Sequence, residues 1–289
     1  MKCNLCPRKC NINRNQTEGY CGVSNTLKVA RAELHFWEEP IISGTNGSGT
    51  IFFSGCNLKC VYCQNYNISK NAFGKEISVN RLAEIFKELE SKGAHNINLV
   101  TPSHYVTQIV EALKIYKPKI PIVYNSSGYD SLQELELLKN YVDVYLVDLK
   151  YFSSELSEQY SKAKNYFEVA TKAILKMVEY QPQNIIENNL IKKGVIIRHM
   201  VLPNHYEDSF KVLDWIKQNL GDNTCVSIMG QYVPCNNLTN YPKINRKLKP
   251  IEYKLVINHF NKIGLTNGYC QSLESASESY IPPFNLEGV

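Results

Sequence analysis

From residue 50 onward, the apolar positions of this sequence fall into short runs separated by amphipathic stretches. The runs are a few residues long and rich in Val and Ile, which is typical of strands buried on both faces of a parallel sheet. We predict six such strands, at residues 51–53, 97–100, 120–124, 142–149, 195–202 and 226–229.

Between these runs, apolar residues recur at spacings of three and four, as they do along one face of a helix. The six stripes are Leu82, Phe86 and Leu89; Val106, Ile109, Val110 and Leu113; Leu135 and Leu138; Phe167, Ala170 and Ile174; Val212, Leu213, Ile216 and Leu220; and Tyr253, Val256, Ile257 and Phe260. Two of these helices also carry start signals. Ser131 with Glu134 forms a capping box, and Pro250 suits a first helical position.

Six strands that alternate with helices predict right-handed βαβ units around one parallel sheet. An α/β fold with six units in an open barrel fits this count better than a complete eight-stranded barrel or an open doubly wound sheet. In all of these folds, functional groups gather at the C-terminal ends of the strands. A functional site is therefore expected among the residues that directly follow the predicted strands.

Residues 1–49 differ from the rest of the chain because they are rich in Cys, Asn and Gly and end in a Ser- and Gly-rich run. Few large apolar side chains are present, so the segment has little material for a core. We expect an irregular Cys-rich segment at 1–49 that a bound metal stabilises, followed by the barrel at 50–289.

The composition and the net charge narrow the classes of function that this chain can have. The 289 residues are 44% hydrophobic, which is ample for a sizeable core, and the net charge is +5 with the basic residues scattered. Nucleic acid is therefore an unlikely partner. No stretch is long enough for a membrane-spanning helix, and the first residues lack the apolar core of a signal peptide, so we expect a cytoplasmic protein. Seven of the ten cysteines lie in two tight groups before residue 64, which in a reducing compartment indicates metal ligands.

One cysteine group directly follows the first predicted strand and consists of Cys56, Cys60 and Cys63. Thiolates at this spacing can bind three irons of a [4Fe–4S] cluster and leave the fourth iron open. An open iron at a barrel mouth can chelate the amino and carboxylate groups of S-adenosylmethionine (SAM). An electron passed into the sulfonium then releases a 5′-deoxyadenosyl radical. A structural zinc site is the alternative, but it needs four ligands, and no fourth Cys or His follows closely.

This loop resembles that of radical SAM proteins, and residues 60–65 resemble the pyruvate formate-lyase activating enzyme group. Almost the whole chain resembles the PflX-type homologues of that enzyme. The matching stretches are residues 37–40, 47–50, 93–98, 124–129, 148–150 and 281–284. The resemblance implies a partial (β/α)6 TIM-like barrel, SAM and one catalytic cluster, but it supplies no substrate.

A SAM pocket is expected at the strand ends. Asp148 and Lys150 are two positions apart at the end of the fourth predicted strand, so their side chains point to the same side. The carboxylate can then accept from ribose hydroxyls while the ammonium pairs with the SAM carboxylate. The activating enzymes carry a similar Asp-Leu-Lys stretch, and a strand-end ion pair is the alternative. Arg198 lies inside an apolar run, where an unpaired Arg would be costly. We expect it to contact the SAM carboxylate, with a buried pair to Asp143 or Glu168 as the alternative.

Further cofactor contacts are predicted at other strand ends. Asn125 and Ser127 end the third strand and Gln231 ends the sixth, where each can contact ribose, adenine or substrate. Many radical SAM enzymes carry a Gly-Gly-Glu stretch after the second strand that holds the SAM amino group. Here Thr101 would have to substitute through its hydroxyl or its carbonyl. Tyr62 is expected to pack over the cluster or the adenine, with a plain core position as the alternative.

The second cysteine group is N-terminal and comprises Cys3, Cys6, Cys10 and Cys21. Four thiolates suit a closed zinc site or an auxiliary iron–sulfur cluster equally well in number. A zinc ribbon normally has two Cys-x2-Cys pairs, and only one is present here. The identity of this second metal stays open.

The sequence therefore predicts an enzyme that cleaves SAM reductively and abstracts hydrogen from a protein or peptide substrate. By analogy with the activating enzymes, a glycyl-radical enzyme is the first candidate substrate, and a flavodoxin or ferredoxin is the expected electron donor. One alternative is a radical SAM enzyme that modifies a small molecule or a peptide. The other is a non-catalytic iron–sulfur or zinc binding module.

Overall fold

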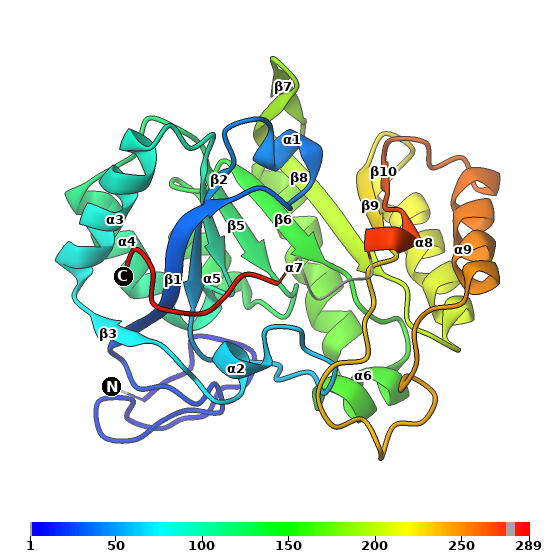
Figure 1. The fold of residues 1–289 in the computed structure, drawn as a ribbon, viewed down its shortest axis with the longest axis horizontal. Helices are drawn as coiled ribbons and strands as arrows, with labels where there is room; N and C mark the ends of the chain where they lie inside the picture. The colour runs from blue at the N-terminus through cyan, green and yellow to red at the C-terminus, as the bar shows by residue number, and fades with distance from the viewer. Residues whose placement is uncertain (1, 276–280) are drawn as a thin grey trace.

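The computed structural model describes residues 2–275 and 281–289, and it is organised around one sheet (Figure 1). The strand order is β10-β9-β8-β6-β5-β4-β2-β1-β3, and β7 pairs with β8 beside this path. The strands are β1 (Leu27–His35), β2 (Ser48–Phe53), β3 (Lys75–Ile77), β4 (Ile97–Val100), β5 (Ile122–Ser126), β6 (Val144–Asp148), β7 (Ile185–Glu187), β8 (Leu190–Met200), β9 (Cys225–Met229) and β10 (Gly268–Cys270). All six predicted strands are present as neighbouring strands of the same sheet.

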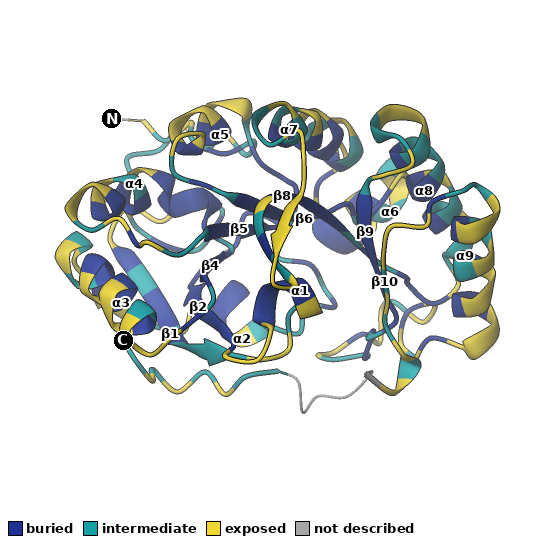
Figure 2. Ribbon diagram, turned by 90° about the horizontal axis from the view of Figure 1, so that it is seen from above, coloured by how far each residue is buried: buried dark blue, intermediate teal, exposed yellow. Residues whose placement is uncertain are grey.

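The central part of this sheet is parallel from β2 through β4, β5, β6, β8 and β9 to β10. The helices are α1 (Pro40–Ser43), α2 (Tyr66–Ser69), α3 (Val79–Ser91), α4 (Val106–Ile115), α5 (Leu132–Leu138), α6 (Ser154–Ser161), α7 (Tyr166–Tyr180), α8 (Tyr206–Leu220) and α9 (Pro250–Lys262). Figure 2 shows the strands in an arc, with α3, α4, α5, α7, α8 and α9 along its outer side. Parallel strands joined by outer helices leave the strand ends free to carry a site.

The predicted helix signals are realised in the structure. At the start of α5, the Ser131 hydroxyl accepts from the Glu134 amide at 3.1 Å, and the Glu134 carboxylate accepts from the Ser131 amide, so the capping box is complete. Pro250 is the first residue of α9. The short α6 was not predicted from the sequence, and it has an N-cap bond from the Leu156 amide to the Ser153 hydroxyl.

The expectation that residues 1–49 are irregular is wrong for β1. This nine-residue strand pairs antiparallel with β2, with Val29 opposite Phe53 and His35 opposite Ser48. A register shift between Val29 and Arg31 interrupts the two-residue alternation of apolar and polar positions, which hides the strand in the sequence. Residues 2–26 contain no regular helix or strand. The segment without regular structure is therefore residues 2–26, which is shorter than the predicted segment of residues 1–49.

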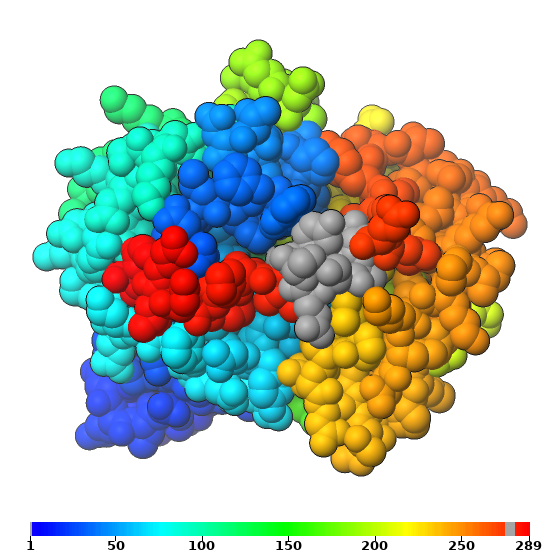
Figure 3. All heavy atoms as spheres, viewed as in Figure 1, coloured from blue at the N-terminus to red at the C-terminus, as the bar shows by residue number. Residues whose placement is uncertain are grey.

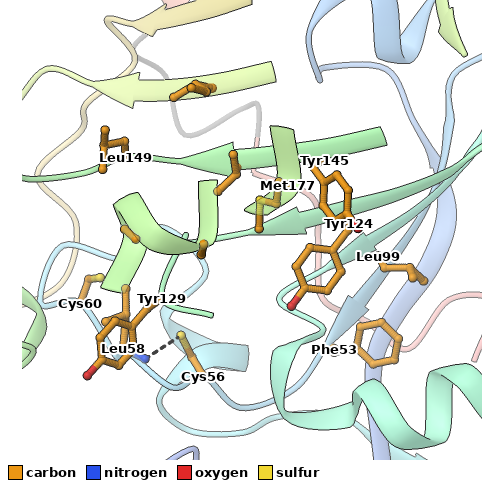
Figure 4. Packing of buried hydrophobic residues seen from close by; sticks show 14 of the residues in the cluster. Phe53, Cys56, Leu58, Cys60, Leu99, Tyr124, Tyr129, Tyr145, Leu149 and Met177 are labelled. Atoms are coloured by element: carbon orange, nitrogen blue, oxygen red, sulfur yellow. Dashed lines mark hydrogen bonds between the residues drawn. The ribbon is translucent and has the colours of Figure 1, made fainter. Parts of the chain in front are cut away.

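The main core lies between the sheet and the outer helices, and it reaches the first cysteine loop. Tyr124 and Tyr145 from neighbouring strands are fully buried there beside Phe53. Figure 4 shows that the same cluster continues to Cys56 and Cys60 at the end of β2. Close packing of this kind leaves side chains few alternative positions, so the loop is anchored by the core of the fold.

The C-terminal residues return to the first strand of the chain. The Leu286 amide donates to the Ala30 carbonyl at 3.1 Å, and the Ala32 amide donates to the Glu287 carbonyl at 2.9 Å. Figure 3 shows residues 281–289 lying across the face of the molecule beside residues 36–44. Among the described residues, no helix has the length and apolarity needed to cross a membrane.

Candidate functional site

The loop that follows β2 presents three cysteines at the C-terminal end of the first parallel strand. Cys56 and Cys60 are buried and Cys63 is half-buried. The loop begins at Gly55, whose φ of +85° is in the region that favours glycine, and a Cβ there would lie 2.8 Å from the Cys21 carbonyl oxygen. Only glycine therefore lets the chain turn this closely into the cysteine loop.

Each of the three sulfurs accepts a hydrogen bond from the surrounding protein. The Ser161 hydroxyl of α6 donates to the Cys60 sulfur at 2.9 Å, and the Ser69 hydroxyl of α2 donates to the Cys63 sulfur at 3.3 Å. The Leu58 amide donates to the Cys56 sulfur at 3.4 Å (Figure 4). Donors of this kind stabilise thiolates and set the reduction potential of a cluster bound to them.

The chemistry of these three thiols fits a cubane cluster better than a single ion. Burial, together with the nearby thiols of Cys60 and Cys56, raises the pKa of Cys63 to about 12. Bound irons would be needed to hold all three as thiolates. A single structural zinc ion needs four ligands, whereas in a cubane each of three thiolates binds a different iron.

A charged network lies beside the cysteine loop and centres on Arg198 of β8. Its guanidinium donates to Asp148 at 2.8 Å, to Glu38 at 3.1 Å and to the side-chain oxygen Oδ1 of Asn125 at 2.6 Å. Lys150 donates to the second Asp148 oxygen at 2.6 Å. The alternatives of Asp143 and Glu168 as partners of Arg198 are wrong, because the strand register places Asp148 directly opposite Arg198.

Opposite charges hold Asp148 ionised despite its burial. Burial alone would raise the pKa of Asp148, but Arg198 and Lys150 outweigh it and hold the pKa below its usual value. Burial raises the pKa of Glu38, and the attraction of Arg198 only partly offsets this rise. Glu38 also accepts from the amides of Asn98 and Asn125. Asp148 is thus a charged carboxylate at the strand ends.

One pocket brings most of the predicted site residues together. Its walls include two of the three loop cysteines, the charged network and three further predicted contacts: Cys60, Cys63, Asp148, Lys150, Arg198, Tyr62, Asn125 and Gln231. Asp148 and Lys150 form the strand-end ion pair that was the alternative, and they also face this pocket. Tyr62 occupies the core position that was the alternative, and its packing over the cluster or the adenine stays a prediction. It lines the pocket, and it is buried with its hydroxyl 2.5 Å from that of Tyr151.

Thr101 and Ser127 are not among the residues that line this pocket. Thr101 has a φ of +57°, and its amide donates to the Asn125 carbonyl at 2.9 Å, while its neighbour Val100 lines the pocket instead. The Ser127 carbonyl accepts from the Tyr166 hydroxyl at 2.7 Å, on the helix side of the sheet. The left-handed backbone of Thr101 and the contact of Ser127 with Tyr166 are consistent with the position of both residues outside the pocket lining.

Sequence reasoning assigned no ligand role to several residues that contact the site. Glu38 comes from the segment after β1 and lines the pocket. Its negative charge, in a segment that precedes the cysteine loop, was the sequence signal that could have identified it. Ser161 belongs to the unpredicted α6, so nothing in the sequence pointed to its bond with Cys60. Cys235 lies near the cysteine loop, where its sulfur is 3.3 Å from the Tyr62 carbonyl. Cys225 is a buried core thiol.

The second cysteine group forms a compact lobe beside the first. Cys6 and Cys21 are buried, and a Cβ at Gly19 would lie 3.3 Å from the Cys21 sulfur and 3.8 Å from the Cys10 sulfur. Burial raises the pKa of Cys6 to about 12, and Glu134, Cys21 and Cys10 add to this rise. Cys6, Cys10 and Cys21 are therefore near neighbours in a segment without regular structure.

The parallel sheet and the three-cysteine loop at its C-terminal edge define a class of α/β proteins with a cluster-binding loop. The family model of the Radical SAM superfamily matches residues 50–216, which is more than half of the chain. The chain therefore belongs to the Radical SAM superfamily. Membership implies a [4Fe–4S] cluster, SAM and SAM-dependent radical chemistry.

Two relatives and two solved structures show how far this similarity extends. The chain is 35% identical over 91% of its length to the uncharacterized protein MJ0674 of Methanocaldococcus jannaschii, of which it covers 75%. It is 24% identical over 74% of its length to the pyruvate formate-lyase-activating enzyme of Clostridium pasteurianum, of which it covers 85%.

The two solved structures share the fold. Methylornithine synthase (PylB) has a TM-score of 0.50 at 15% identity, over 93% of this chain and 77% of that one. SuiB of Streptococcus suis, bound to its precursor peptide SuiA, has a TM-score of 0.52 at 18% identity. That match covers 76% of this chain and about half (48%) of the SuiB chain.

Proposed function

We propose that this chain cleaves SAM reductively and uses the resulting 5′-deoxyadenosyl radical to abstract hydrogen from a protein or peptide substrate. The observation that carries the proposal is a single pocket that joins the thiols of Cys60 and Cys63 to the charged groups of Asp148, Lys150 and Arg198. A [4Fe–4S] cluster on Cys56, Cys60 and Cys63 supplies the electron and the open iron that this chemistry needs.

The charges of the pocket complement those of SAM. Lys150 offers an ammonium for the SAM carboxylate, and Asp148 offers an ionised carboxylate for ribose hydroxyls. Asn125 and Gln231 add amide groups that can hydrogen-bond to ribose or adenine. Tyr62 adds an aromatic face next to the cysteines. Arg198 acts mainly as the residue that fixes Asp148, Glu38 and Asn125 in place.

The fold proposal is a partial (β/α)6 barrel. The six predicted strands occur in order in one sheet, and the helices lie along its outer side (Figure 2). In the described residues, the sheet ends at β10 on one side and β3 on the other without closing. An open barrel leaves a lateral entrance through which a large substrate can reach the strand ends.

The substrate proposal is an activating-enzyme type of reaction on a protein, with a glycyl-radical enzyme as the first candidate. It is supported by the 24% identity to the Clostridium pasteurianum activating enzyme over 74% of the chain. We also keep the PflX-type assignment as a proposal, which rests on the matching stretches at residues 37–40, 47–50, 93–98, 124–129, 148–150 and 281–284. The reaction needs a one-electron donor, for which we propose a flavodoxin or ferredoxin of the cytoplasm.

We also propose a metal at Cys3, Cys6, Cys10 and Cys21, either zinc or an auxiliary iron–sulfur cluster. The support is the clustering of four thiols in residues 2–26, a segment without helix or strand. Metal binding supplies folding free energy where a core is too small to do so.

Deuterium transfer tests the function and separates the substrate classes. The reconstituted enzyme is incubated with dithionite, SAM and either the protein fraction or the small-molecule fraction of cells grown in deuterated water. We expect deuterium in the methyl group of 5′-deoxyadenosine only with the protein fraction, and none with the Cys60→Ala variant. Transfer from the small-molecule fraction would overturn the protein substrate and favour small-molecule modification. Absence of any 5′-deoxyadenosine would contradict an enzymatic role and favour a non-catalytic binding module.

A further inference from the structure

Three buried hydroxyl groups form a hydrogen-bonded chain that ends on a sulfur of the catalytic loop, residues 55–65. The Tyr62 hydroxyl lies 2.5 Å from the Tyr151 hydroxyl, which lies 2.7 Å from the Ser161 hydroxyl. The Ser161 hydroxyl donates to the Cys60 sulfur at 2.9 Å. Because Tyr62 also lines the pocket, the chain runs from the pocket wall to a thiol that would bind the cluster.

The protons of this chain can be arranged in one direction only. A thiolate that binds iron accepts hydrogen bonds and has no proton to donate. Ser161 has one hydroxyl proton and gives it to Cys60, so its oxygen accepts from Tyr151. The single proton of Tyr151 is then used, so its oxygen accepts from Tyr62. All three O–H groups therefore point their positive ends toward the Cys60 sulfur.

The chain is shielded from solvent along its whole length. Ser161 and Tyr151 are 0% exposed, and Tyr62 is 4% exposed. In an environment of low dielectric constant, consecutive hydrogen bonds polarise and strengthen one another. The Tyr151 hydroxyl therefore strengthens the bond that Ser161 makes to Cys60, and the Tyr62 hydroxyl strengthens it further from one step behind.

Backbone contacts hold Ser161 in place independently of the two tyrosines of the chain. Ser161 is the last residue of α6, and the preceding Tyr160 carbonyl accepts from the Val61 amide of the catalytic loop at 2.9 Å. On the other side, the Arg8 guanidinium donates to the Ser161 carbonyl at 3.1 Å. A tyrosine of the chain can therefore lose its hydroxyl while the serine stays next to the sulfur.

We propose that Tyr62, Tyr151 and Ser161 form a hydroxyl chain that sets the reduction potential of the catalytic cluster. The two tyrosines are positioning residues that act through Ser161. The proposal rests on the radical SAM function above, and it adds the residues beyond the cysteines that control how readily the cluster takes up its electron. The aligned hydroxyls stabilise the negative charge that the cluster gains from a one-electron donor, so the intact chain raises the potential.

The test is a redox titration of the anaerobically reconstituted full-length protein without SAM, followed by electron paramagnetic resonance. At the midpoint potential of the wild type, the ratio of reduced to oxidised cluster should fall about fivefold in Ser161→Ala. It should fall about twofold in Tyr151→Phe, which keeps the ring and removes only the second hydroxyl, and less in Tyr62→Phe. The control Tyr145→Phe should match the wild type, because it removes a buried hydroxyl of β6 that has no hydrogen-bond partner among the described residues.

A double-mutant cycle separates the chain from a general packing effect. In the Ser161→Ala background, Tyr151→Phe should cause no further shift, because the bond through which Tyr151 acts is already gone. An unchanged potential in Tyr151→Phe, or an equal shift in both backgrounds, would overturn the proposal. If Tyr151→Phe does not fold, Tyr62→Phe takes its place in the cycle and is judged by the same two outcomes. A wild-type protein without a reducible cluster would instead contradict the proposed function itself.

Discussion

The two cysteine-bearing regions of this protein are held in place by different forces. The catalytic loop follows a fully buried strand, joins the main core through Cys56 and Cys60, and receives hydrogen bonds at all three sulfurs. Residues 2–26 contain no helix or strand and only a few buried residues. The first set of thiols is positioned by the fold, whereas the structure of the second set would depend on the metal that we propose for it.

Because of this difference, we expect the loss of each set of cysteine ligands to have a different effect. Removing a preorganised set of ligands should abolish chemistry and leave the structure, because the core does not rely on the metal. Removing ligands from the N-terminal lobe should disturb structure locally and leave the chemistry of the pocket. The predictions below test that division, beginning with the largest effect.

Replacing the three loop cysteines should give the largest functional loss with little structural change. We expect Cys56→Ala/Cys60→Ala/Cys63→Ala to lose about four irons and all SAM cleavage, with an unchanged far-ultraviolet circular dichroism spectrum. The matched control is Cys225→Ala, which removes a buried thiol of β9 away from the loop and should keep both iron and activity. Loss of cooperative unfolding in the triple variant would show that the fold itself depends on the cluster.

Replacing N-terminal cysteines should give a large but local structural effect. In Cys3→Ser/Cys6→Ser, we expect one metal centre to be released and proteolytic cleavage to appear within residues 2–26, because the segment has no core of its own. Limited proteolysis with mass spectrometry locates the cleavage, and Cys270→Ser on β10 serves as the control. Protease resistance equal to that of the wild type would mean that packing against the rest of the chain, including the bonds from Arg8 to the Asn57 and Ser161 carbonyls, suffices.

Changing the charged pocket residues should weaken SAM binding by an intermediate amount. Asp148→Asn and Lys150→Met each remove a charged hydrogen-bonding group, so we expect SAM affinity to fall about tenfold or more in each variant. The cluster absorbance should stay intact. Lys172→Met, which removes an exposed lysine of α7, should bind SAM normally. If both pocket variants bound SAM like the wild type, the pair would be a structural ion pair only.

Removing a hydrogen bond to a cluster sulfur should have the smallest effect. The Ser161 hydroxyl stabilises negative charge on Cys60, so Ser161→Ala should lower the reduction potential by about 40 mV, the equivalent of about 1 kcal/mol for one electron. Ser69→Ala should shift it less, because that bond is longer at 3.3 Å. Ser157→Ala in the same α6 is the control for helix changes. A shift no larger than that of Ser157→Ala would remove Ser161 from the redox role.

The sequence predicted the elements whose signals are local and periodic. Buried Val- and Ile-rich runs revealed all six central strands, and the capping box of Ser131 and Glu134 located the start of α5. The cysteine spacing, together with the strand before it, was enough to locate the cluster loop. These features depend on neighbouring residues alone, so a single sequence carries them.

Other features depend on contacts between distant parts of the chain, and the sequence could not predict them. A register shift disguised β1, and the ion pair from Arg198 to Glu38 spans 160 positions. Thr101 follows a predicted strand, but its left-handed backbone places it outside the pocket lining. The bond between the Cys21 carbonyl and the Cys56 amide became visible only in three dimensions. Tertiary packing decides each of these cases.

The central claim is that the loop after β2 holds the cluster that cleaves SAM. Its most direct test is the yield of 5′-deoxyadenosine and methionine from SAM by the anaerobically reconstituted wild type with dithionite. The account predicts equal amounts of both products from the wild type, and neither product from Cys56→Ala, Cys60→Ala or Cys63→Ala. Undiminished 5′-deoxyadenosine from any one of these three variants would contradict it.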